Sequence, residues 1–171
     1  MNKYTVKLLT RNAVVAAVYF LLTLISFPIS YGLIQVRIAE LLVLLCFFNR
    51  DYAVGITIGC LLANAFGPGN MGVFDIIFGT LATFLSCIGV SFCKHLLIST
   101  FIPVVLNSFT IAAVLLFAGG ESHTYFAMVG ILALGEIIAV TILGYLIFIS
   151  LKKNEKFMSL IDAKKNQEFK W

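Results

Sequence analysis

The sequence predicts an all-α integral membrane protein with six transmembrane helices and both termini in the cytoplasm. The first reason is composition, because 61% of the 171 residues are hydrophobic, 12% are charged, and the mean hydropathy is +1.04. A soluble domain carries about 25% charged residues, and a chain of this length has too little interior to bury so much apolar surface. The second reason is the division of the apolar residues into six segments, and the third is the alternation of basic residues between them.

The six apolar segments have unequal lengths. They extend over residues 13–28, 36–48, 52–66, 73–92, 96–118 and 125–151. A helix that crosses the hydrocarbon core perpendicularly needs about 20 residues, with a range of about 17–25. The last three segments meet this requirement and the first is marginal. The second and third are short, so we expect either that flanking polar residues extend them or that they end beside a cavity inside the protein, where irregular backbone is tolerated.

Basic residues alternate between the two ends of these segments. Eleven of the twelve Lys and Arg residues lie in the N-terminal tail, in the second and fourth connections and in the C-terminal tail, whereas the connections at 30–34, 67–72 and 119–124 contain none. Lys and Arg concentrate in cytoplasmic loops. We therefore expect residues 1–171 to form a single six-helix membrane domain, with residues 152–171 as a cytoplasmic tail.

Small residues recur at every fourth position in two segments. They are Gly55, Gly59, Ala63 and Gly67 in the third segment and Ala13 and Ala17 in the first. Such stripes let helix backbones approach closely, which is the main route to helix association in lipid. In the third segment we favour packing inside the bundle. In the first segment, packing inside the bundle and docking of another protein are comparably supported.

The twelfth basic residue, Arg37, lies on the external side with Gln35 and Glu40, where the second segment enters the bilayer. A helix N-terminus disfavours a cation, and a charge near hydrocarbon needs a partner or a function. Arg37 and Glu40 are three residues apart, so they share a helical face and can pair. A self-neutralising pair at the outer interface is the alternative. We favour a ligand-binding role.

Further polar residues lie in the apolar segments. Asn64 is near the outer end of the third segment, and Asp75 is in the first turn of the fourth, where helix capping and ligand contact are equally supported. Glu136 lies about 18 Å along the sixth segment, near the midplane, where an ionised carboxylate costs about 2.5–3.5 kcal/mol. Asn107 lies at a comparable depth. A Glu–Asn bond that orients two helices is the alternative, but we favour the floor of a cavity.

The sequence lacks motifs for catalysis or metal binding. The four cysteines form no C-x-x-C pair and have no His at a metal-ligand spacing, so we expect them to be packing residues. No phosphate-binding loop or hydrolase motif is present. The basic residues flank apolar segments rather than forming a nucleic-acid surface. We therefore expect no cofactor, no metal, no nucleic-acid partner and no enzymatic activity, and we favour binding or transport.

Several motifs follow one another in a distinctive order. After a short basic tail and an Ala-rich first segment come Gln35-Val-Arg37-Ile-Ala-Glu40-Leu-Leu, Gly59-Cys-Leu-Leu-Ala-Asn64, Asp75-Ile-Ile-Phe-Gly79-Thr-Leu-Ala-Thr83 and Leu134-Gly-Glu136. This order resembles the QueT family, which are substrate-binding S components of energy-coupling factor (ECF) transporters. The resemblance extends from Arg11 to Leu151.

The resemblance implies a six-helix subunit of a prokaryotic plasma membrane that captures a vitamin-like molecule from outside. Its partners would be a membrane coupling subunit, which packs against Ala13 and Ala17, and two cytoplasmic ATPase subunits. The implied cargo is a queuosine precursor, a 7-deazaguanine base. A carboxylate can accept two parallel hydrogen bonds from its amino-imino edge, and a second can pair an aminomethyl cation. The candidate ligand-binding residues are Gln35, Arg37, Glu40, Asn64, Asp75, Asn107 and Glu136.

Two alternatives remain open. Cargo changes readily among S components, so a pyrimidine or pyridoxine-like vitamin is an alternative heterocycle. The chain is also compatible with an autonomous small-molecule carrier that works without ATPase partners.

Overall fold

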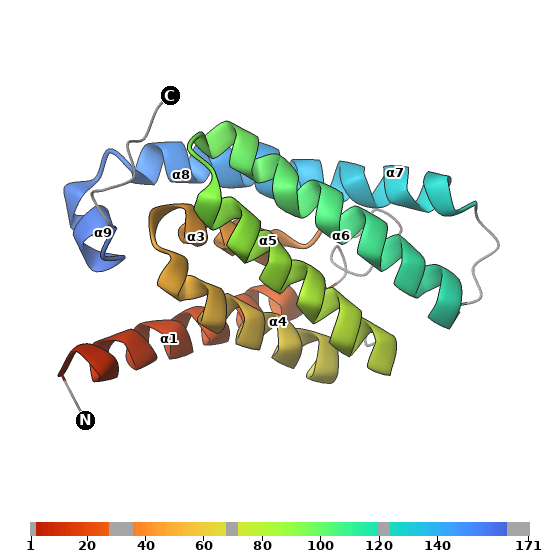
Figure 1. Cartoon of the computed structure of the whole chain (residues 1–171), viewed down its shortest axis with the longest axis horizontal. Helices are drawn as coiled ribbons and strands as arrows, with labels where there is room; N and C mark the ends of the chain where they lie inside the picture. Colours follow the sequence, from red (N-terminus) through yellow and green to blue (C-terminus); the bar gives the residue numbers. More distant parts are fainter. Residues whose placement is uncertain (1–2, 28–35, 68–71, 120–123, 164–171) are drawn as a thin grey trace.

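The computed structural model describes residues 3–27, 36–67, 72–119 and 124–163, and every regular element in these ranges is helical (Figure 1). The α-helices are α1 (Lys3–Ile25), α3 (Leu45–Phe48), α4 (Ala53–Phe66), α5 (Thr80–Phe92), α6 (Leu96–Gly119), α7 (Tyr125–Glu136), α8 (Tyr145–Leu151) and α9 (Glu155–Leu160). Two short 3₁₀-helices are η1 (Ile38–Leu44) and η2 (Arg50–Tyr52), and two π-helices are η3 (Asp75–Gly79) and η4 (Ile137–Gly144).

Four helices in the described ranges are long and apolar enough to cross a membrane. They are Thr5–Ile25, Asp75–Phe92, Leu96–Phe117 and Tyr125–Leu151. The predicted second and third segments are shorter, at Ile38–Phe48 and the 14 residues of α4. The prediction of an all-helical fold is therefore confirmed in the described ranges, and four helices have the length and composition of membrane spans. Six spans and cytoplasmic termini stay predictions.

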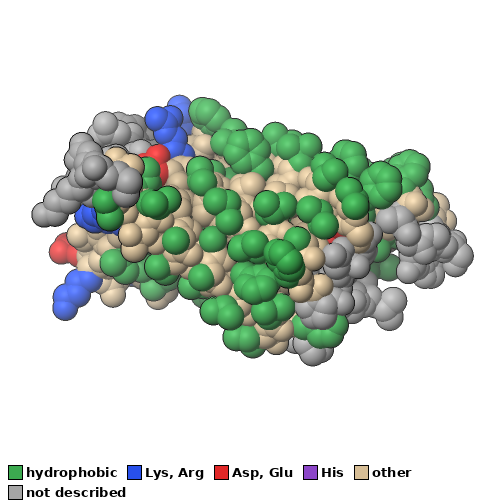
Figure 2. All heavy atoms as spheres, turned by 90° about the horizontal axis from the view of Figure 1, so that it is seen from below, with side chains coloured by type: hydrophobic (Ala, Val, Ile, Leu, Met, Phe, Trp, Pro, Cys, Tyr) green, Lys and Arg blue, Asp and Glu red, His purple; other side chains and the backbone are tan. Residues whose placement is uncertain are grey.

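The surface of the molecule is apolar around its middle. Figure 2 shows hydrophobic side chains over most of the visible face, with Lys and Arg gathered toward one end. Large apolar side chains such as Ile25, Phe92 and Phe117 are 78–80% exposed. Such an extensive apolar surface is uncommon on a soluble monomer. It fits a protein whose surface contacts the lipids of a membrane.

The short second segment lies in the interior of the bundle. Val43, Leu44 and Phe47 are at most 2% exposed and belong to the main hydrophobic cluster, together with side chains of α1, α4 and α5. A second cluster lies where α6 meets α7, and it consists of Ile111, Ala112, Met128, Val129 and Leu132. Helix α7 packs chiefly against α6 and its own continuation η4.

Close packing of α1 on α4 depends on glycine. A Cβ atom at Gly55 would lie 2.5 Å from the Asn12 carbonyl oxygen, and one at Gly59 would lie 2.8 Å from the Ala16 carbonyl oxygen. The Asn12 side chain also accepts a hydrogen bond of 2.7 Å from the Gly55 N–H. The predicted role of this stripe in internal packing is confirmed at both glycines.

Two Asn side chains form hydrogen bonds at the end of the molecule where α1 begins and α9 lies (Figure 1). Asn154 begins α9 by accepting hydrogen bonds from the N–H groups of Lys156 and Phe157, which satisfies donors that a helix start leaves unpaired. Asn49 donates to the carbonyl oxygens of Ile161 and Asp162 at 3.4 and 3.1 Å. These bonds connect the turn after α3 to the end of α9.

Candidate functional site

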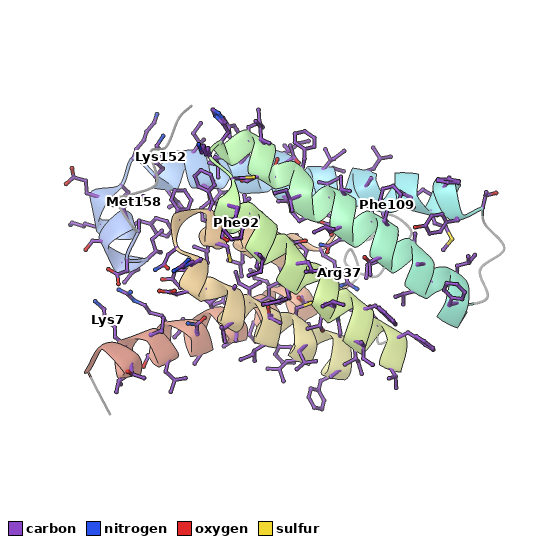
Figure 3. All side chains as sticks on the ribbon, in the orientation of Figure 1. Lys7, Arg37, Phe92, Phe109, Lys152 and Met158 are labelled. Atoms are coloured by element: carbon purple, nitrogen blue, oxygen red, sulfur yellow. The ribbon has the colours of Figure 1, made fainter. Side chains whose placement is uncertain are left out.

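A small cavity of about 10 Å³ lies inside the bundle, beside the cluster that contains Ile111 and Leu132. It is lined by Arg37, Gly79, Thr83, Asn107, Ser108, Ile111, Leu132 and Glu136. Figure 3 places Arg37 in the middle of the bundle, away from the end that carries Lys7 and Lys152. The volume suits about one water molecule, whereas a drug-sized ligand occupies a pocket of about 300–1,000 Å³. Binding of a heterocycle therefore requires the cavity to widen.

Glu136 and Asn107 form one wall of this cavity. The Asn107 Nδ2 group donates a hydrogen bond of 3.2 Å to Glu136 Oε1, and the two residues are 4% and 5% exposed, respectively. The bond between helices considered from the sequence is therefore present, and both residues also face the cavity. Their remaining oxygens, Glu136 Oε2 and Asn107 Oδ1, have no hydrogen-bond partner among the described residues.

Arg37 lies on another wall and is paired with Asp75. Its Nη2 atom is 3.9 Å from Asp75 Oδ1, and its Nη1 group donates to Asn64 Oδ1 at 3.5 Å. Asn64 in turn donates to the Asp75 carbonyl oxygen at 3.3 Å. Both ionic side chains are buried, at 8% and 0% exposed, so this is an interior ion pair.

The ion-pair partner of Arg37 is Asp75 and not Glu40, the partner that the sequence spacing allowed. Arg37 precedes the helix η1 and has non-helical dihedral angles, with φ −84° and ψ 89°. The rule that side chains three residues apart share a face applies only inside a helix. Arg37 is 7% exposed, so the alternative of a pair at the outer interface is excluded as well.

Glu40 lies one layer behind the cavity wall. Its Oε1 atom accepts hydrogen bonds from the Tyr19 hydroxyl at 2.5 Å and from Thr83 Oγ1 at 3.2 Å. Thr83 also contacts Cys60 Sγ at 3.3 Å, and Cys60 accepts a bond from Asn64 at 3.5 Å. A continuous polar chain therefore connects Glu40, through Thr83, with the residues around Arg37.

The structure thus divides the seven candidates from the sequence into three groups. Arg37, Asn107 and Glu136 line the cavity. Glu40, Asn64 and Asp75 support these residues or their neighbours from behind. Gln35 lies outside the described residues.

Sequence reasoning missed several wall residues, of which Thr83 is the most informative. Asp75, Gly79 and Thr83 follow one another at intervals of four, which places them on one side of a helix. This spacing is the signal that predicts Thr83. Gly79 belongs to the same stripe because a Cβ atom there would lie 2.9 Å from Asn64 Nδ2 and 3.0 Å from Asp75 Oδ1. Ser108 directly follows Asn107, and no motif marks it.

Two acidic residues of the site adjoin π-helical turns. Asp75 begins η3, and Glu136 is the last residue of α7 before η4. π-helical turns are rare and are frequently found at functional sites.

In the ranges that the structure describes, no three His, Cys, Asp or Glu residues are grouped closely enough to hold a metal ion. The described polar groups of the site form hydrogen bonds and one ion pair.

Comparisons with known proteins give a family match and a similar transporter sequence. The family model described as QueT transporter matches residues 9–153, a range that contains every residue lining the cavity. A protein of Lactococcus lactis subsp. cremoris (strain MG1363) described as "Queuosine precursor transporter QueT" is 41% identical over 73 residues. That alignment covers 42% of this chain and 41% of the relative's length. No solved structure matches the chain.

The family match extends over most of the chain, as the resemblance in the motifs implied. Together with four helices of spanning length, it identifies a multi-pass membrane protein of a transporter class, and the expectation that the chain is not an enzyme is confirmed. The chain belongs to the QueT transporter family.

Proposed function

We propose that this protein binds a queuosine precursor, a 7-deazaguanine base, and is the substrate-capturing S subunit of an ATP-driven ECF importer. The observation that carries this proposal is the buried Glu136–Asn107 pair, which faces the cavity that Arg37 also lines. Such a base has both donors and acceptors along one edge, and this site has both acceptors and a cation. The printed name of the Lactococcus lactis relative supports the same class of cargo.

The charge of the site supports a neutral or cationic ligand. Among the described side chains of the site, Glu40, Asp75 and Glu136 are acidic and only Arg37 is basic. An additional anion buried here would be costly, because a low-dielectric interior penalises charges without an opposite partner. A 7-deazaguanine base is neutral, and its aminomethyl derivative is a cation. Acidic vitamins are disfavoured on this ground.

The direction of capture follows from the proposed topology. Lys7 and Lys152 lie at one end of the bundle, and Arg37 lies nearer its centre (Figure 3). If that basic end faces the cytoplasm, as basic flanks generally do, the connections at 67–72 and 119–124 are external. Residues 36–48 and 52–66 then complete six spans, and the ligand reaches the cavity from outside.

The coupling subunit of the importer would dock on α1. Ala13 and Ala17 are exposed, and so are their neighbours Val14 and Val18, at 56% and 39%. The buried face of α1 uses Asn12 and Ala16 against α4 instead. The small exposed stripe is thus available for close approach by another membrane helix, with two ATPase subunits bound to that partner in the cytoplasm.

Ligand binding to the purified protein tests the proposal. We expect mass spectrometry to find a co-purifying 7-deazaguanine base, and we expect calorimetry to show binding of 7-aminomethyl-7-deazaguanine. Glu136→Ala should abolish binding while circular dichroism and thermal unfolding show an intact bundle. A pyrimidine or pyridoxine-like compound in the mass spectrum would contradict the assigned cargo.

Reconstitution separates the S subunit from an autonomous carrier. The protein alone in liposomes should bind the base without moving it across the membrane. Ala13→Trp and Ala17→Trp should leave binding intact and prevent assembly with the coupling subunit, which co-purification measures. Uptake by the protein alone would contradict the ATP-driven role.

A further inference from the structure

We infer that Glu136 and Asn107 together read the amino-imino edge of the base, so that the site selects a 2-amino-4-oxo ring over rings lacking either donor of that edge. This inference rests on the proposed function and assigns individual ligand atoms to individual side chains. It starts from two acceptor atoms in the cavity wall.

The Glu136–Asn107 pair is buried and has two acceptor atoms without a partner among the described residues. Glu136 and Asn107 are at least 95% buried, and both line the cavity. One hydrogen bond joins them, from Asn107 Nδ2 to Glu136 Oε1. The two atoms of the pair that lack a partner among the described residues, Glu136 Oε2 and Asn107 Oδ1, are both acceptors. Buried acceptors without donors are costly and uncommon in native proteins.

The hydrogen bond between the two residues fixes the orientation of the amide. It runs from Asn107 Nδ2 to Glu136 Oε1, so Asn107 directs its NH₂ group toward Glu136. Its carbonyl oxygen is consequently the group that remains available. The pair therefore offers one acceptor from each residue, and a complementary ligand carries an N–H donor for each of them.

Ring types differ in the hydrogen-bond donors that they can offer to these two acceptors. In a guanine-type ring, the ring N–H lies next to an exocyclic amino group, and these are two adjacent donors. A hypoxanthine-type ring lacks the amino group, so one acceptor stays unpaired. An adenine-type ring has an acceptor nitrogen beside its amino group. That nitrogen would face an acceptor of the pair, and two acceptors cannot form a hydrogen bond. Of these three ring types, only the guanine type carries a ring N–H and an adjacent amino group that can donate to Glu136 Oε2 and Asn107 Oδ1.

Arg37 is placed to bind the carbonyl oxygen of the ring. The carbonyl oxygen beside the ring N–H is an acceptor, and Arg37, which lines the same cavity, carries only donors. Arg37 is held in place by Asn64 and Asp75. The apolar side chains of Ile111 and Leu132 complete the wall and suit the faces of a flat ring. Together, the donors of Arg37 and the acceptors of Glu136 and Asn107 complement a 2-amino-4-oxo edge.

Titration of the full-length protein with three analogues tests the inference. The probes are 7-deazaguanine, 7-deazahypoxanthine and 7-deazaadenine, and the readout is the dissociation constant from calorimetry. We expect 7-deazaguanine to bind on the order of a hundredfold more tightly than either analogue, because a site built for a donor rejects a ligand that lacks it.

Substitution of the pair should remove this preference. In Glu136→Gln and in Asn107→Leu, we expect the preference for 7-deazaguanine over 7-deazahypoxanthine to fall below roughly tenfold, since one acceptor is lost. Glu155→Gln is the matched control, because Glu155 is an exposed acid on α9. The comparison of analogues in the unmodified protein needs no variant, so a folding defect in either variant leaves the test intact.

The outcomes separate this inference from the proposed function. If 7-deazaguanine and 7-deazahypoxanthine bind the unmodified protein equally well, the edge assignment is wrong and the cargo class stands. If the variants keep the full preference, the edge is read by other residues and the assignment is again wrong. If none of the three bases binds, the proposed function fails and the edge assignment fails with it.

Discussion

Tyr19 on α1 donates a hydrogen bond of 2.5 Å to Glu40 on η1, and each side chain is only 1% exposed. The bond joins the first helix to the buried second segment, 21 residues away in the sequence. It also orients the carboxylate toward Thr83, which lines the cavity. The Tyr19–Glu40 contact therefore supports the position of Thr83 in the cavity wall, although neither Tyr19 nor Glu40 lines the cavity.

Tyr19→Phe should weaken this support. The variant removes one of two donors to a buried carboxylate, and a hydrogen bond to a charged group contributes about 1.5–3 kcal/mol. We expect the free energy of unfolding in detergent to fall by that amount and ligand affinity to fall with it. Tyr145→Phe is the control, because no hydrogen bond of the Tyr145 hydroxyl is seen within the described part of the chain. Equal stability of both variants would contradict the role of Tyr19.

Gly59→Leu should separate α1 from α4. A Cβ atom at Gly59 would lie 2.8 Å from both the Ala16 carbonyl oxygen and Tyr19 Cβ, so a larger side chain forces the helices apart. Overpacking of this kind costs about 1–3 kcal/mol, which thermal unfolding measures. Gly130→Leu provides the comparison, since a Cβ atom there meets nothing within 4 Å. The idea fails if Gly59→Leu unfolds at the same temperature as Gly130→Leu.

Leu132→Trp should block the site without unfolding the bundle. Leu132 is 6% exposed and lines the cavity, whose volume of about 10 Å³ leaves no room for an indole ring beside a ligand. We expect the affinity for 7-deazaguanine to fall by roughly tenfold or more, a loss of at least about 1.4 kcal/mol. Leu134→Trp on the same helix is the matched control, because Leu134 is 59% exposed. Unchanged binding by Leu132→Trp would place the ligand elsewhere.

Asn49→Ala should release α9 from the bundle. The Asn49 side chain is 4% exposed, donates to the Ile161 and Asp162 carbonyl oxygens and accepts from the Asp51 N–H. We expect faster hydrogen exchange in α9 and a stability loss of about 1–2 kcal/mol.

Asp162→Ala serves as the comparison for Asn49→Ala. It removes the ion pair with Arg11, which has a length of 2.8 Å and a half-exposed carboxylate. Surface ion pairs contribute only about 0–1 kcal/mol, so the effect should be smaller and should shrink with added salt. A larger effect of Asp162→Ala than of Asn49→Ala would reverse this ranking.

The helices and the polar positions at depth were predictable because hydrophobicity and charge are local properties of the chain. Glu136 and Asn107 stood out since each is polar inside a long apolar segment, and their depths agree when helical rise is counted along two segments. The stripe from Gly55 to Gly59 was predictable for a similar reason. Residues four positions apart lie on the same face of a helix, whichever helix packs against that face.

The partner of Arg37 was not predictable in this way. The helical spacing pointed to Glu40, but Arg37 lies before the helix begins, and its ion-pair partner Asp75 is 38 positions further along the chain. Likewise, the burial of Glu40 behind Thr83 depends on how η1 packs against α1 and α5. These contacts join segments whose relative placement no local pattern encodes.

Composition and charge pattern alone specified the membrane environment of this protein, its helical class and most of the charged and amide side chains that lie inside it. They did so because a charged or amide side chain in an apolar segment is costly wherever the helices lie. Which of these residues face the cavity and which support its wall became known from the three-dimensional arrangement of the helices. That choice depends on distances of 2.5–3.9 Å between side chains of different helices, and such distances are set by packing of the whole bundle.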